Sequence, residues 1–227
     1  MKGKTAILLL VILGAGYAGW LLLPRYYNPF SPLSLDDPAG RIARFKLHRL
    51  TPAQCATLLE DANRRGWLSS RPVADSGGPC PLTGAVRVFA FGSVRLSSSF
   101  LASCPLALSS ALFIQQRAKP LTLTLMNSEL RQVDHLGSFA CRNIYHRENA
   151  RRSEHATADA LDISGFRLAD GRRITVARGW QASDSGLWLR ALLSASCGYY
   201  GNGLGPAYNA AHGNHFHLGM RGYGVCR

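Results

Sequence analysis

The longest apolar run of the chain lies near its N-terminus. Residues 5–23 carry no charged side chain, and two lysines precede them. A run of this length can cross a bilayer as a helix, and a basic flank tends to stay on the cytoplasmic side. We therefore expect a cytoplasmic tip at 1–4, a transmembrane anchor at 5–23 and export of the remainder. A signal peptide cleaved after Ala18 is the alternative, but the apolar run continues past that site to Leu23.

Proline is dense in the next segment, residues 24–47. Four prolines stand there among tyrosine, serine and aspartate residues. Proline at this density stiffens and extends a chain. We expect 24–47 to be a linker that holds a folded domain, residues 48–227, away from the membrane surface.

Three segments of the folded part have helical patterns. The first, 51–65, opens with a threonine cap, a proline at the first helical position and a glutamine three residues after the cap. The second, 105–117, has several leucines and an isoleucine as its apolar residues. The third, 183–197, opens on a serine and an aspartate, either of which can cap it, and ends before a glycine.

Between these helices the chain contains short β-rich segments. They are 86–94, 132–141, 160–163, 173–176 and 215–220. No internal repeat is present. The mixture predicts an α+β fold with a small, mostly antiparallel sheet and helices on one side of it.

The chain is basic, with 26 Lys and Arg residues against 13 Asp and Glu and a formal net charge of +13. This balance favours anionic partners such as nucleic acid, anionic lipid or an acidic cell-wall polymer. The sequence has no Arg-rich helix, zinc-finger spacing or aromatic RNA-binding signature. Together with export, this argues against nucleic acid as a partner.

The cysteines all follow the apolar run. They are Cys55, Cys80, Cys104, Cys141, Cys197 and Cys226. An even number on the exported side of a membrane predicts disulfides, although the sequence cannot select the pairing. Buried free thiols are the alternative. No Cys-x-x-Cys pair is present, so a thiolate zinc site is not expected.

His155 and Asp162 form a first candidate metal motif. They lie seven residues apart within Ser-Glu-His-Ala-Thr-Ala-Asp-Ala-Leu-Asp-Ile, residues 153–163. An imidazole nitrogen and a carboxylate oxygen are both good zinc ligands. The spacing differs from that of a helical histidine pair, and it suits a loop carrying His155 that leads into a strand carrying Asp162. A lone histidine is more often structural, so this motif depends on a second one.

The second motif is a cluster of three histidines, His212, His215 and His217, within six residues. On a strand, His215 and His217 would project to the same face. Two imidazoles crowded on one face are unusual in a packed core, and they suit a metal or catalytic site. The two motifs together supply three protein ligands and leave spare histidines. An open fourth position is typical of a catalytic zinc, which lowers the pKa of its bound water to about 7.

Both motifs resemble those of zinc peptidases. Ser-Glu-His-x-Thr-x-x-x-x-Asp-Ile resembles the first zinc motif of the D-Ala-D-Ala carboxypeptidases and dipeptidases, the LAS metallopeptidases. His-x-x-His-x-His resembles the second motif of the penicillin-insensitive murein endopeptidases of that group. The stretch from about residue 73 to residue 227 resembles still more closely the extensin-like C-terminal domain family of bacterial envelope proteins. The matching segments are 71–75, 137–143, 153–155, 160–166, 204–206 and 208–212.

The resemblance implies a LAS/hedgehog-like zinc-peptidase core. Together with the anchor and export expected from the apolar run, it predicts a single-pass inner-membrane protein whose domain lies in the periplasm. It assigns the zinc ligands to His155, Asp162 and His217. It makes His215 a buried polar partner or proton shuttle, and His212 a general base where carboxypeptidases of the group use glutamate.

Arg142 falls where the LAS group has the arginine of its Gly-Tyr-Arg-Ser segment. The resemblance implies that it polarises the scissile carbonyl or binds a substrate carboxylate; a structural ion pair is the alternative. The chain departs from the peptidases at two points. Ala158 stands where they usually have glycine, and no glutamate lies three residues before His217.

Two functions follow as hypotheses. The first is a membrane-anchored, zinc-dependent peptidase that acts on peptidoglycan peptides in the periplasm. The second is a non-catalytic envelope module of the same fold that binds peptidoglycan.

Overall fold

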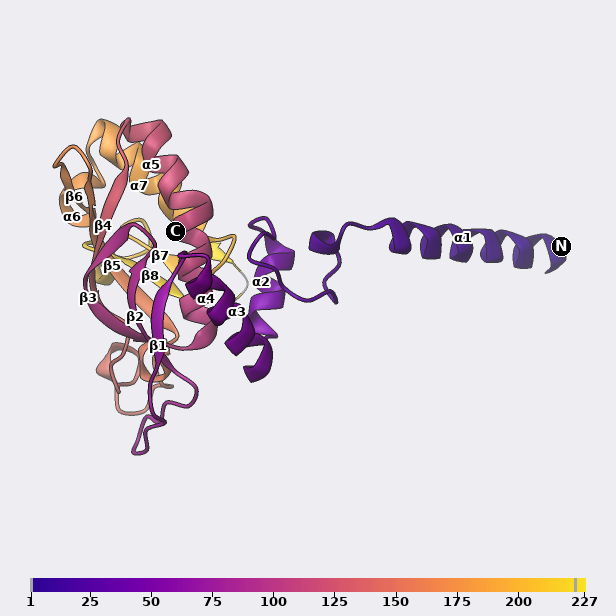
Figure 1. Ribbon diagram of the computed structural model, residues 1–227, viewed down its shortest axis with the longest axis horizontal. Coiled ribbons are helices and arrows are strands. Elements are labelled where there is room, and N and C mark those ends of the chain that lie inside the picture. Colours follow the sequence, from indigo (N-terminus) through magenta and orange to yellow (C-terminus); the bar gives the residue numbers. More distant parts are fainter. Residues whose placement is uncertain (1, 223) are drawn as a thin grey trace.

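A nine-stranded sheet flanked by helices forms the frame of the folded part of the chain (Figure 1). The computed structural model describes residues 2–222 and 224–227. The strand order is β1-β2-β3-β4-β5-β8-β7-β9, and β6 pairs with β5. The strands are β1 (Ser69–Pro72), β2 (Val86–Phe91), β3 (Val94–Ala102), β4 (Leu130–Gly137), β5 (Ala160–Leu168), β6 (Arg173–Thr175), β7 (Asn202–Leu204), β8 (Phe216–Gly219) and β9 (Val225–Cys226). The expected α+β class is confirmed.

The sheet is mixed, which corrects the expectation of a small, mostly antiparallel sheet. β3 pairs with β4 in parallel, and β7 pairs with β9 in parallel. A parallel pair needs a long crossover connection, because a short hairpin joins only antiparallel strands. The helices between β3 and β4 supply this crossover. The strand patterns in the sequence do not reveal it, because they do not specify which neighbour each strand pairs with.

The crossover is a continuous helical segment with a π-helical turn in its middle. Its parts are α4 (Cys104–Phe113), the turn η2 (Ile114–Ala118) and α5 (Lys119–Met126). Ser103 caps it by accepting a hydrogen bond from a first-turn amide. Pro120 has no N–H to donate, and the π-helical turn before it accommodates the missing bond. The helix predicted at 105–117 therefore continues to the end of α5.

Helix α7 (Ser183–Ser196), which follows the short α6 (Val176–Gly179), packs against α5 and the sheet. The fully buried Trp188 of α7 meets Phe166 of β5 edge-on, with ring centroids 5.1 Å apart. Its indole Nε1–H donates to the Thr122 hydroxyl of α5 at 3.2 Å. One side chain thus ties α5, α7 and β5 together.

The segment predicted as one strand, 86–94, is a β-hairpin. β2 ends at Phe91, and β3 begins at Val94 after a two-residue turn. Gly92 has φ +64°, and a Cβ there would lie 2.7 Å from the Gly66 carbonyl oxygen. Glycine is needed because the backbone approaches another loop closely in a left-handed conformation.

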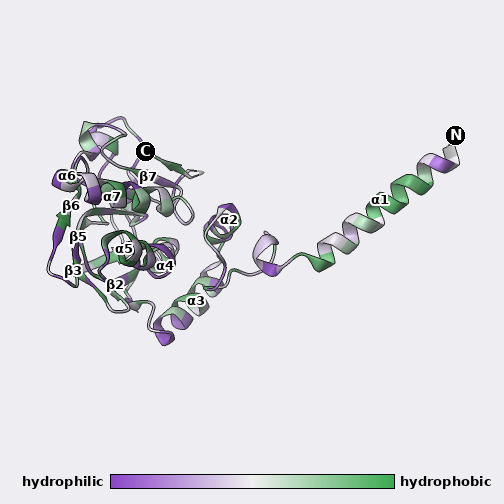
Figure 2. Cartoon of the chain, turned by 90° about the horizontal axis from the view of Figure 1, so that it is seen from above, coloured by the Kyte–Doolittle hydropathy of each residue, from purple (hydrophilic) through white to green (hydrophobic). Residues whose placement is uncertain are grey.

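The apolar N-terminal run forms α1 (Lys2–Leu22), which extends away from the rest of the chain in Figures 1 and 2. Figure 2 shows that α1 is apolar along most of its length. Residues 3–22 are long and apolar enough to cross a membrane. A signal sequence has the same length and composition, so a single span and a signal sequence both fit this helix.

The expected linker, 24–47, needs correction because much of it packs onto the domain. Leu33, Leu35 and Leu47 are buried in the main core. After the short turn η1 (Arg25–Tyr27), the segment contains α2 (Arg41–His48). The prolines bend this segment, but its leucines gain more from burial than they would in an extended, solvated linker. The folded domain therefore starts well before residue 48.

Three disulfides join segments far apart in the sequence, which confirms the expected disulfides and fixes their pairing. They are Cys55–Cys104, Cys80–Cys141 and Cys197–Cys226. The first ties α3 (Pro52–Arg64) to α4. α3 has the predicted capping box between Thr51 and Gln54. The second fixes the loop that precedes Arg142, and the third anchors β9.

A buried ion pair tests whether the segment before residue 48 belongs to the fold. Lys46 Nζ lies 2.9 Å from Asp37 Oδ2, and the side chains are 3% and 9% exposed. Removing one partner of a buried pair leaves an uncompensated charge. We expect Lys46→Met to lower the free energy of unfolding by about 3 kcal/mol in chemical denaturation followed by tryptophan fluorescence.

The matched control is the neighbouring Asp36→Asn. Asp36 pairs with Arg65 in an exposed ion pair, so the free energy should change by less than about 1 kcal/mol. If Lys46→Met is as stable as the wild-type chain, the Lys46–Asp37 pair contributes nothing to fold stability.

Acid stability should depend on Asp134 of β4, which joins three strands. It accepts hydrogen bonds from Gln132, Arg167 of β5 and Arg173 of β6. Although burial opposes this, the hydrogen bonds lower the pKa of Asp134 below its ordinary value. A lowered folded-state pKa stabilises the fold above the unfolded pKa of about 3.9, and this contribution is lost as pH falls through the folded value.

We therefore expect Asp134→Asn to lower the unfolding free energy by about 1–2 kcal/mol between pH 5 and pH 8. The difference from the wild-type chain should shrink below about pH 4. Denaturant titrations across this range would measure it. A difference that does not vary with pH would contradict the role of the ionised carboxylate.

Candidate metal centre

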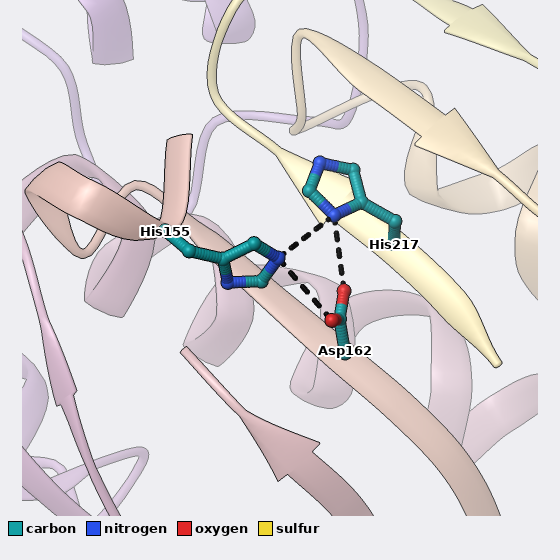
Figure 3. Close-up of side chains that lie close together, drawn as sticks. All are labelled: His155, Asp162 and His217. Carbon is teal, nitrogen blue, oxygen red and sulfur yellow. Dashed lines mark hydrogen bonds and ion pairs between the residues drawn. The ribbon is translucent and has the colours of Figure 1, made fainter. Parts of the chain in front are cut away.

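The two sequence motifs meet beside the β5–β8 pair (Figure 3). His155 lies on the 3₁₀ turn η4 (Glu154–Thr157), Asp162 on β5 and His217 on β8. β5 and β8 are antiparallel neighbours, and Asp162 stands directly opposite His217. Directly opposite residues project to the same face of a sheet. The strand register therefore brings the second motif onto the first.

A tight turn brings His155 back to the strand that follows it. Ser153 caps the turn by accepting a hydrogen bond from the His155 amide at 3.3 Å. Ala158 ends the turn in the left-handed region, with φ 51°. That conformation costs a residue with a Cβ about 1–2 kcal/mol, so glycine would be the less strained residue at this position.

Three ligand atoms converge in this site. His155 Nε2 lies 3.2 Å from Asp162 Oδ2 and 3.2 Å from His217 Nδ1. His217 Nδ1 lies 3.0 Å from Asp162 Oδ1. One ligand atom from each residue lies within 4.8 Å of the other two. All three side chains are largely buried, with exposed fractions of 6%, 16% and 11% in sequence order.

A hydrogen bond to the backbone determines which nitrogen of His155 can act as a ligand atom. Its Nδ1 donates to the Ser138 carbonyl oxygen at 3.0 Å, so its neutral ring presents the Nε2 lone pair to His217. Two buried nitrogens 3.2 Å apart need a proton or a metal ion between them. Two imidazoles and one carboxylate are a donor set that catalytic zinc sites use. The residues present fit that ion.

The electrostatics of the site favour a positive charge. Although burial opposes it, hydrogen bonds to Asp162 and Glu154 raise the pKa of His217 to about 9. Burial also opposes ionisation of Asp162, yet hydrogen bonds to His155 and His217 hold the pKa of that carboxyl well below its usual range. The buried carboxylates therefore attract a cation, whether a proton or a metal ion.

Glu154 is a member of the site that the sequence analysis missed. Its Oε2 lies 3.5 Å from His217 Nε2, at the outer limit of a hydrogen bond. Its Oε1 accepts from the Arg221 amide at 2.7 Å, and Oε2 accepts from Asn202 Nδ2 at 2.9 Å. Its signals in the sequence are that it directly precedes His155 and that it belongs to the Ser-Glu-His motif. The sequence does not show that β8 lies beside this turn, and without that knowledge an acidic residue before His155 does not indicate a site residue.

The structure also brings His212 and His215 to the site. His212 ends the 3₁₀ turn η5 (Ala210–His212), and its ring centroid lies 5.9 Å from that of His217. Its Nδ1 bonds Asn209 Oδ1 at 2.7 Å. His215 directly precedes β8 instead of lying on it, and its Nε2 is 3.7 Å from Asp162 Oδ1.

Both of these rings are weak bases. Burial, followed by the charges of His217 and His215, lowers the pKa of His212 to about 4. Burial is also the largest cause that lowers the pKa of His215. Neutral imidazoles beside the cluster are able to accept a proton.

The contact of Arg142 with the segment that carries His155 is made by its backbone. Its carbonyl oxygen accepts from the Ser153 amide at 3.1 Å, beside the segment that carries His155. In the described part of the chain the half-buried side chain makes no hydrogen bond or ion pair. Among the described residues, the guanidinium makes neither a hydrogen bond with the cluster nor a structural ion pair.

Fold and site define a disulfide-bonded α+β domain with a candidate metal centre at its sheet. The family model described as "Extensin-like protein C-terminus" matches residues 53–227, and the chain belongs to this family. No curated protein and no solved structure matches the chain significantly. The match covers every residue of the candidate centre.

Proposed function

We propose that the chain is a membrane-anchored, zinc-dependent hydrolase that cleaves peptides of peptidoglycan in the periplasm. The observation that carries the proposal is the convergence of His155, Asp162 and His217, a buried pair of imidazoles with one carboxylate. The motif resemblance to LAS-type peptidases supports a hydrolytic use of this donor set. A bound zinc ion supplies a Lewis acid that polarises a carbonyl and lowers the pKa of water.

His212 is the proposed general base. Asn209 Oδ1 holds its Nδ1–H, so Nε2 keeps a lone pair. Its lowered pKa of about 4 leaves the free ring unprotonated at neutral pH, so the Nε2 lone pair is available before substrate binds. It would take the place of the glutamate that carboxypeptidases of the resembling group use. His215, near Asp162 Oδ1, is placed to hold or return that proton.

Arg142 is the proposed substrate contact. Its side chain is unpaired among the described residues, and the Cys80–Cys141 disulfide fixes the chain directly before it. A free guanidinium can bind a substrate carboxylate in bidentate fashion or polarise a carbonyl. Peptidoglycan stem peptides carry such carboxylates.

The cellular placement rests on three features. The apolar helix α1 is long enough for a single inner-membrane span. Three disulfides suit an oxidising compartment such as the periplasm. The net charge of +13 suits an anionic polymer.

The second candidate is a non-catalytic module of the same fold that binds peptidoglycan. The feature that favours it is Asn214, which stands three residues before His217 where carboxypeptidases of the LAS group have a glutamate base. Metal binding does not separate the two candidates, whereas bond cleavage does.

Zinc binding should depend on the cluster. We expect the metal-free wild-type chain to take up about one zinc ion in equilibrium dialysis followed by metal analysis. His155→Ala and His217→Ala each remove a ligand and should reduce uptake by at least about tenfold. His146→Ala is the matched control, because His146 lies exposed on a loop outside the cluster. Zinc uptake by the two cluster variants equal to that of the control would overturn the assigned site.

Cleavage should depend on His212 without loss of the metal. We expect the zinc-loaded wild-type chain to release fragments from purified muropeptides, detected by mass spectrometry. His212→Ala should keep zinc and lose about 100-fold or more in kcat/KM, because a general base contributes about that much. A zinc-loaded wild-type chain that binds muropeptides and cleaves none would favour the binding module.

A further inference from the structure

A buried carboxylate lies behind the candidate ligand His217. Glu154 Oε2 is 3.5 Å from His217 Nε2, on the opposite side of the ring from the cluster atom Nδ1. The Glu154 and His217 side chains are only 12% and 11% exposed. A carboxylate in this position is shielded from solvent and directed at the ring.

The chain holds this carboxylate in place with fixed groups. The Arg221 amide donates to Oε1 at 2.7 Å, and Asn202 Nδ2 donates to Oε2 at 2.9 Å. The space that Glu154 occupies exists because residue 219 is glycine. A Cβ at Gly219 would lie 2.5 Å from Glu154 Oε1, which is too close for any atom pair without displacement.

The consecutive residues Glu154 and His155 therefore lie against the two ring nitrogens of His217, one on each nitrogen. His155 Nε2 faces His217 Nδ1, and Glu154 Oε2 faces His217 Nε2. Both nitrogens of His217 face carboxylates: Nδ1 is 3.0 Å from Asp162 Oδ1, and Nε2 is 3.5 Å from Glu154 Oε2. A cation bound among His155, Asp162 and His217 would take the place of the proton on Nδ1. Because a carboxylate accepts hydrogen bonds and donates none, Glu154 would then keep the remaining proton on Nε2 and leave the Nδ1 lone pair for the cation. Carboxylates behind metal-binding histidines fix the ring tautomer in this way.

We propose that Glu154 is a positioning residue that holds His217 in the Nε2–H tautomer and so makes Nδ1 a metal-binding atom. The inference rests on the proposed zinc function of the site. The competing explanation is that Glu154 only anchors the segment after β8 by accepting from the Arg221 amide. The two explanations differ in what a neutral, equally large side chain should do.

Glu154→Gln separates them. The backbone amide of Arg221 is a fixed donor, so the glutamine oxygen should stay on it. The side-chain NH₂ then faces His217 Nε2 and favours the opposite tautomer, with the proton on Nδ1. The contact with the Arg221 amide survives, whereas the NH₂ group can no longer accept from Asn202 Nδ2, and the metal-binding lone pair of His217 is disfavoured.

The experiment measures zinc affinity of the full chain by competition with a chelator. Thermal melting of the metal-free protein provides the structural readout. We expect Glu154→Gln to raise the dissociation constant for zinc about 10- to 100-fold, with only a small fall in melting temperature from the lost Asn202 contact. The ¹⁵N spectrum of the zinc-loaded wild-type chain should show His217 protonated at Nε2. Gly219→Ala, which displaces the carboxylate without removing its charge, should also weaken zinc binding.

The matched control is Asp159→Asn, which removes the same charge from the same segment. Asp159 bonds the Thr157 hydroxyl and touches none of the three cluster residues. If Glu154→Gln binds zinc as tightly as Asp159→Asn does, or if the His217 ring of the zinc-loaded wild-type chain is protonated at Nδ1 and not at Nε2, the positioning role is overturned. If the wild-type chain itself binds no zinc, the proposed function fails and this inference with it.

Discussion

The antiparallel pairing of β5 with β8 is the constraint on which the site depends. Its register sets Asp162 opposite His217. A slip of one residue would turn one of these side chains to the other face of the sheet. β5 also pairs with β4 and β6, and Trp188 packs on its Phe166. The site therefore stands on the most restrained strand of the sheet, whose position several elements determine together.

The parts of the site differ in how firmly the fold holds them. The three cluster residues come from two paired strands and a capped turn, and they are largely buried. His212 comes from a turn in the loop before β8, where Asn209 joins it to the Tyr145 hydroxyl of another loop. A rigid cluster with a histidine on a loop suits a centre that binds an ion tightly and lets a larger molecule approach.

Local signals in the sequence predicted local structure well. The capping box of Thr51 and Gln54 located the start of α3, and the spacing of His155 and Asp162 pointed to a loop that leads into a strand. What failed depends on partners distant in sequence. Leu33 lies in a proline-rich segment and finds its core contacts elsewhere in the chain, and Glu154 becomes part of the site only through β8. The parallel pairing of β3 with β4 could not be predicted either, because the sequence does not show where the crossover helix brings the chain back to the sheet.

The net charge of the chain and the charge of the candidate metal centre have opposite signs. The net charge is +13, yet the site concentrates negative charge, because Asp162 and Glu154 both lie beside His217. At separations near 3 Å in a buried place, these carboxylates dominate over arginines that are dispersed on the surface and screened within about 10 Å by salt. A cation can therefore bind inside a strongly basic protein. The same surface remains free to attract an anionic polymer, so the overall charge and the candidate metal centre serve the proposed function without opposing each other.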